Sequence, residues 1–142
     1  MDMKKIMGYI YSDGGRSNYF KGNTGDCVCR AIAIASGRDY KDVYNSLKKA
    51  IGGSPRNGVY TNKPNFKRWM TENGFEWVSC AGIGKKIAVH FVEGELPKGK
   101  MVCSVAKHYV AVVDNIVYDT WDSRYNCFGE LRRIYGYWLY KS

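Results

Sequence analysis

Cys27 occupies a position where a thiol could act as a nucleophile. It directly precedes the run Val28 to Ala35, which is apolar at every position except Arg30. This pattern predicts a thiol in the first turn of a buried helix, where free backbone amides and the helix dipole favour the thiolate. If the chain performs covalent chemistry, Cys27 is therefore the expected nucleophile.

His108 and Asp119 could supply the proton-transfer partners of this thiol. Two β-type runs, residues 109–113 and 116–118, are separated only by Asp114-Asn115. Asp and Asn tolerate positive φ, so this interval predicts a two-residue type I′ hairpin. In that register His108 and Asp119 lie on the same face, on diagonal positions roughly 5–8 Å apart. A carboxylate could therefore orient the imidazole.

A thiol at a helix start, a histidine on a strand and a carboxylate beside that histidine are the parts of a Cys-His-Asp nucleophilic site. The thiol must ionise, the imidazole must accept and return a proton, and the carboxylate must hold the ring in the useful tautomer. The backbone amide of Cys27 is one expected oxyanion donor, and the side chain of Asn23 is the candidate second donor.

Each of these residues also has a structural interpretation. Cysteine is among the most buried residue types, so Cys27 could be a core residue, and His108 could be a hydrogen-bonded structural histidine. Trp121 is expected to be a core aromatic that also shields the bond between His108 and Asp119. The remaining thiols are expected to be packing or surface residues: Cys29, Cys80, Cys103 and Cys127.

No metal or cofactor site is expected. The sequence has no Cys-x-x-Cys or His-x-x-x-His pair, and its two histidines are far apart. It also lacks a complete Walker or dinucleotide glycine motif.

Three helices are expected to position the thiol and to build the first half of the core. The capping and stop signals predict one helix from Cys27 to about Ser36 with Asp26 as its N-cap, one after Asp39 that closes at Gly52-Gly53, and one from about Pro64 to Gly74.

Strands dominate the second half. We expect them at residues 77–80, 101–106, 109–113, 116–118 and 135–140, with a further short strand at 9–11 and a short helix over 86–92. The predicted fold class is α+β, with N-terminal helices, one of them buried and central, packed on a C-terminal antiparallel sheet. Residues 1–142 are expected to form one domain.

The composition of the chain indicates which partners and which cell compartment to expect. The net charge is +9, but the basic residues are dispersed in pairs, which favours a solvated surface over a nucleic-acid tract. No stretch predicts a signal peptide or a membrane anchor. Five cysteines without a disulfide spacing are typical of a reducing cytoplasm.

Three phrases, Gly25 to Ile32, His108 to Asp114 and Asp119 to Ser123, resemble the papain-like cysteine peptidase superfamily. Its members place the nucleophile at the start of a central helix and the histidine on a following sheet. Asp119-Thr120-Trp121 stands where Asn-Ser-Trp is common, with Asp replacing Asn as in bacteriocin-leader peptidases. Where superfamily members commonly have Gln, this chain has Lys21. More narrowly, the phrases look like small proteins of phages and of bacteria carrying phage DNA.

The resemblance implies a papain-like thiol hydrolase with Cys27 as nucleophile, His108 as base and then acid, and Asp119 as the orienting group. The expected substrate is a protein or peptide, cleaved at a peptide or isopeptide bond without a cofactor. Two alternatives stay open: a catalytically idle version of the fold that binds a host protein in the host cytoplasm, and a basic nucleic-acid-binding domain.

Overall fold

The structure is a computed structural model that describes residues 5–22, 25–80 and 88–141. The described residues form three α-helices, α1 (Cys27–Ser36), α2 (Tyr40–Ile51) and α3 (Pro64–Glu72), and two short 3-10 helices, η1 (Arg16–Asn18) and η2 (Pro55–Asn57). The predicted helix boundaries are confirmed to within two residues.

A six-stranded sheet is formed by one strand that precedes the helices and five that follow them. Its members are β1 (Gly8–Tyr11), β2 (Phe75–Ser79), β4 (Lys100–Val105), β5 (His108–Val113), β6 (Ile116–Asp119) and β8 (Gly136–Tyr140), in the order β1-β6-β5-β4-β8-β2. All neighbours pair antiparallel except β1 and β6, which are parallel. The chain is therefore mixed α+β with a mostly antiparallel sheet, as the sequence predicts at this level.

Glycines end the first two helices, and Asp residues stand at their N-cap positions. The backbone enters the left-handed region at Gly37 and Gly52, at φ 71° and 72°, which ends α1 and α2. Asp39 caps α2 by accepting from two backbone amides. Asp26 occupies the N-cap position of α1, as predicted, but its side chain makes no capping hydrogen bond.

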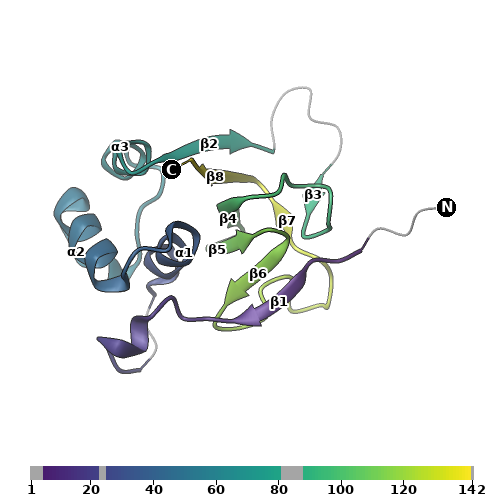
Figure 1. Cartoon of the computed structure of the whole chain (residues 1–142), viewed down its shortest axis with the longest axis horizontal. Coiled ribbons are helices and arrows are strands. Elements are labelled where there is room, and N and C mark those ends of the chain that lie inside the picture. The colour runs from purple at the N-terminus through teal and green to yellow at the C-terminus, as the bar shows by residue number, and fades with distance from the viewer. Residues whose placement is uncertain (1–4, 23–24, 81–87, 142) are drawn as a thin grey trace.

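The sheet separates two hydrophobic clusters. One face packs against α1 and α3, with α1 closest to β5 at the centre of the sheet, and α2 packs on these two helices from outside (Figure 1). The other face is covered by a separate two-stranded pair, β3 (Val89–His90) and β7 (Arg133–Ile134), and by the loops around it. Because α1 lies across the middle strands, its first residue reaches the end of the sheet where β5 starts.

The hairpin that joins β5 to β6 has the predicted turn. Asp114 and Asn115 have φ of 47° and 67°, and Val113 pairs with Ile116. Both positive φ values are those that a type I′ turn requires. This turn fixes the register that sets His108 beside Asp119.

One predicted element is wrong and one pairing was not foreseen. Residues 88–92 are not helical: Val89 and His90 form β3, and Phe91 is fully buried against the far face of the sheet. Residues 86 and 87 of that predicted helix lie outside the described part. β1 pairs with β6 in parallel, which local patterning does not signal. Within the described ranges, no helix is long and apolar enough to cross a membrane.

Candidate active site

A cleft of about 570 Å³ opens at the end of the sheet where β4 turns into β5. Cys27 lines it from the helical side and His108 from the sheet side. The turn at Ala106 and Lys107 and the loop from Gly58 to Thr61 form its remaining walls. The cleft therefore brings together the two residues that the sequence assigns to nucleophile and base.

Cys27 is the first residue of α1 and is half-buried at the floor of this cleft. Burial raises the pKa of its thiol, but a hydrogen bond and the charge of His108, the backbone amide of Tyr109 and the charge of Arg30 together lower it below its ordinary value. The amide of Cys27 belongs to the first helical turn, which has no intrahelical acceptor for its N–H groups. These interactions favour the thiolate, and the Cys27 amide has no acceptor within its own helix.

His108 is held by Asp119 through one defined ring nitrogen. Nε2 of His108 lies 2.6 Å from Oδ2 of Asp119, and both side chains are at least 90% buried. A carboxylate only accepts, so Nε2 carries the proton that it donates. Nδ1 is the ring nitrogen left for the Cys27 thiol, which is the tautomer that a general base needs.

Electrostatics favours an ion pair of thiolate and imidazolium. Burial lowers the pKa of His108, but the bonds and charges of Asp119 and Cys27 outweigh it and raise that pKa to about 9. The Cys27 pKa moves in the opposite direction for the same reason. Each group therefore stabilises the charged form of the other near neutral pH.

Asp119 is fixed by several donors in addition to His108. The Ser123 hydroxyl donates to Oδ2 at 2.8 Å, and the backbone amide of Thr120 donates to Oδ1 at 2.7 Å. Burial raises the pKa of Asp119, whereas bonds from His108, Ser123 and Thr120 lower it to a value below the ordinary one. The carboxylate stays ionised and has no freedom to turn away from the imidazole.

A buried charge network lies beneath these three residues. Asp26 is fully buried, and its oxygens accept from Arg30 and from the Tyr40 hydroxyl at 2.6 Å. Its Oδ2 also forms an ion pair with Arg16, at 2.9 Å from Nε. Arg30 also reaches Asp119, at 3.7 Å between Nη2 and Oδ1. Two guanidinium groups thus face two carboxylates, and Arg30 links the start of α1 to the end of β6.

Trp121 lies beside the imidazole but is not a core residue. It is 42% exposed, which contradicts the expected core position. Its ring centre is 5.0 Å from that of His108, and the Arg132 guanidinium lies 5.3 Å from the Trp121 ring. Trp121 therefore covers one side of His108, as its expected secondary role requires.

The structure brings together Cys27, His108 and Asp119, whereas Asn23 lies outside the described residues. Sequence reasoning missed Arg30 and Ser123. A single arginine inside an apolar helical run was the available signal for Arg30, because a charge there must find a buried partner.

The other thiols are not placed for catalysis. Cys29 is fully buried in the helical core, and burial raises its pKa to about 12. Cys80 and Cys103 lie in the cluster on the far face, and Cys127 is exposed. In the described part of the chain, no group of three or more His, Cys, Asp or Glu residues could hold a metal ion.

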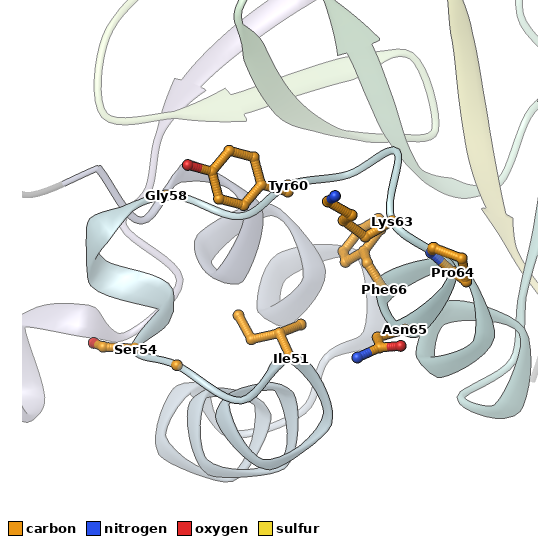
Figure 2. A pocket seen from close by; sticks show the side chains of 9 residues that line it. Ile51, Ser54, Gly58, Tyr60, Lys63, Pro64, Asn65 and Phe66 are labelled. Atoms are coloured by element: carbon orange, nitrogen blue, oxygen red, sulfur yellow. The ribbon is translucent and has the colours of Figure 1, made fainter.

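Two further cavities adjoin the cleft. One, of about 350 Å³, is surrounded by Ile51 at the end of α2, Tyr60 in the next loop and Phe66 in α3 (Figure 2). The other, of about 320 Å³, lies over β2, β4 and β8 and shares Thr61, Ser104 and Tyr109 with the cleft. The first of them shares Gly58 with the cleft, so both cavities have lining residues in common with it.

Comparison with protein-family models, with curated proteins and with solved structures gives no match to this chain. What the site can do chemically is therefore inferred from its own geometry.

Proposed function

We propose that this chain is a papain-like cysteine hydrolase that cleaves a peptide or isopeptide bond with Cys27, His108 and Asp119. The observation that carries the proposal is one cleft lined by the half-buried thiol and by the imidazole that interacts with it, with a buried carboxylate 2.6 Å behind that imidazole. A structural histidine would need only one of these partners.

The proposed reaction uses each group in turn. The Cys27 thiolate attacks the substrate carbonyl carbon, and the resulting oxyanion accepts a hydrogen bond from the Cys27 amide. His108 then donates its Nδ1 proton to the leaving amine, the C–N bond breaks and an acyl-thioester remains. Water attacks the thioester while His108 accepts a proton from it. The acid product leaves, and the thiolate and imidazolium are restored.

Asp119 acts through His108 in this scheme. Its carboxylate keeps the proton on Nε2, which leaves Nδ1 directed to the thiol, and it stabilises the imidazolium. Ser123 and Arg30 keep Asp119 in place. They are positioning residues, because neither of them lines the cleft.

The first test is the alkylation rate of each thiol by iodoacetamide between about pH 5 and 9, mapped by mass spectrometry. We expect Cys27 to react fastest at a pH well below the ordinary thiol pKa of about 8.5. His108→Ala should remove this advantage. His90→Ala is the matched control, because the second histidine of the chain does not line the cleft. A Cys27 that reacts like Cys127 at every pH would overturn the proposal.

The second test is cleavage itself, on a mixed peptide library analysed by mass spectrometry. We expect products with wild-type protein and none with Cys27→Ala. Retained cleavage in Cys27→Ala would overturn the role of the thiol. A thiol that is activated in the first test but yields no product would instead favour the idle, protein-binding alternative.

A further inference from the structure

The hollows around Cys27 are lined by lysines and, among the described residues, by no carboxylate. Lys107 lines the cleft, Lys67 lines the cavity over β2 and β8, and Lys63 lines the cavity of Figure 2. An anionic group that enters any one of these hollows would meet one lysine there.

The cavity over β2 and β8 has a second feature that calls for an acceptor. Trp138 lines it and is 5% exposed, and its Nε1 is buried without a hydrogen-bond partner in the described structure. A buried N–H without an acceptor is costly, and buried indole N–H groups usually find one. Among the described residues lining this cavity, the basic side chain is Lys67, and none is acidic.

We propose that this cavity, defined by Thr61, Lys67, Trp77, Ser104 and Trp138, is a subsite for an acidic side chain of the substrate. The carboxylate accepts a hydrogen bond from Trp138 Nε1 and pairs with the Lys67 ammonium, while Trp77 packs on the aliphatic part of the side chain. The subsite rests on the proposed function, since it shares Thr61, Ser104 and Tyr109 with the cleft that holds Cys27. It assigns acidic peptides as the substrate class.

Calorimetric titration of the Cys27→Ser variant tests the subsite without any need for a reactive thiol. The probes are a blocked alanine-based peptide with two Glu residues, the same peptide with two Gln residues, and an eight-nucleotide oligothymidylate. We expect the Glu peptide to bind at least about tenfold more tightly than the Gln peptide, because a charge-assisted bond and an ion pair are both lost with Gln.

Two pairs of variants locate the effect. Lys67→Glu should abolish the preference for Glu, whereas Lys98→Glu, the same charge change just before β4 at the end remote from the cleft, should keep it. Trp138→Phe should weaken binding of the Glu peptide about tenfold. Trp69→Phe should not, because the Nε1 of Trp69 already donates to Ser46 at 2.9 Å and Trp69 lies outside the cavity.

The outcomes separate the two proposals. Equal or absent binding of the Glu and Gln peptides, or an equal effect of Lys67→Glu and Lys98→Glu, overturns the subsite even if Cys27 proves reactive. Tighter binding of the oligothymidylate than of the Glu peptide also overturns it, in favour of nucleic acid. If Cys27 were inert in alkylation but Cys27→Ser bound the Glu peptide more tightly than the Gln peptide, the hydrolase proposal would be overturned and the acidic-peptide subsite would be supported.

Discussion

Nη2 of Arg30 lies 3.7 Å from Oδ1 of Asp119, while Nη1 of the same guanidinium donates to Asp26. One side chain of α1 thereby neutralises two buried carboxylates that come from distant parts of the chain. The helix that carries the thiol and the strand end that carries the orienting carboxylate are held in one arrangement by this fork.

Replacing Arg30 with Met should therefore cost more than an ordinary surface substitution. Asp26 would lose one of two guanidinium partners in a fully buried position, and breaking a buried ion pair costs about 3–5 kcal/mol. Urea unfolding followed by circular dichroism measures the change. Arg68→Met on the exposed side of α3 is the control and should shift the free energy of unfolding by less than about 0.5 kcal/mol. Similar small losses in both variants would contradict the bridging role.

The stability that His108 contributes should depend on pH in one direction. Its pKa is raised from 6.5 to about 9 in the folded protein, mainly because bonds and charges of Asp119 and Cys27 outweigh burial. The folded state then holds the proton more tightly than the unfolded state, so this contribution is complete below pH 6.5 and disappears as the pH rises through about 9. The difference in unfolding free energy between wild type and His108→Ala, measured from pH 6 to 10, should shrink across that window. A difference that grows with pH would mean that His108 is neutral in the folded protein.

Ser123→Ala should remove one hydrogen bond to Asp119, and we expect the effect to appear in the stability of the protein at acidic pH. The Ser123 hydroxyl is one of the donors that together outweigh burial and keep the pKa of Asp119 below its ordinary value. Without it that pKa rises, so the stability lost on acidification is lost at a higher pH, and the free energy of unfolding near neutrality falls by about 1–2 kcal/mol.

Ser36→Ala is the matched control for this change. Ser36 also donates one hydrogen bond, 2.7 Å to the carbonyl of Ile32, but within α1 and away from the cleft. It should lower stability without moving the acid transition or the pH profile of Cys27 alkylation. If both serine variants left the alkylation profile unchanged, Ser123 would have only a structural role.

Gly136→Ala should deform the cavity over β2 and β8, which Trp77 lines. A Cβ at this position would overlap the six-membered ring of Trp77 and lie 3.0 Å from the carbonyl oxygen of Val78. Overpacking of this kind costs about 1–3 kcal/mol. We expect a lower midpoint of thermal unfolding and altered tryptophan fluorescence. Gly53→Ala, where a Cβ would meet no atom within 4 Å, should change neither.

The parts of the site that are close in sequence could be predicted, and those that depend on distant contacts could not. Asp114-Asn115 fixes a two-residue turn, and that turn alone brings His108 and Asp119 onto one face. Cys27 was identified because its position combines a helix start with an apolar run. These inferences needed only local geometry.

The partners of Asp119 and the role of Asp26 needed the whole fold. The sequence shows Asp26 as a helix cap, yet its side chain is withdrawn into the core by Arg16, Arg30 and Tyr40. The packing of α1 on β5 and β6 determines which arginine pairs with which buried carboxylate, and the spacing of these residues in the sequence does not predict the pairs. The parallel pairing of β1 with β6 was missed for the same reason.

The site combines two residues that are close in sequence with a third that is distant from them. His108 and Asp119 are only eleven positions apart and can meet as soon as their hairpin forms, whereas Cys27 joins them only when α1 has docked on the finished sheet. A chain still leaving the ribosome would therefore carry an ordinary thiol, with no base beside it. Under the proposed function, the reactivity of Cys27 would depend on the docking of α1 on the sheet, and the thiol would then report completed folding.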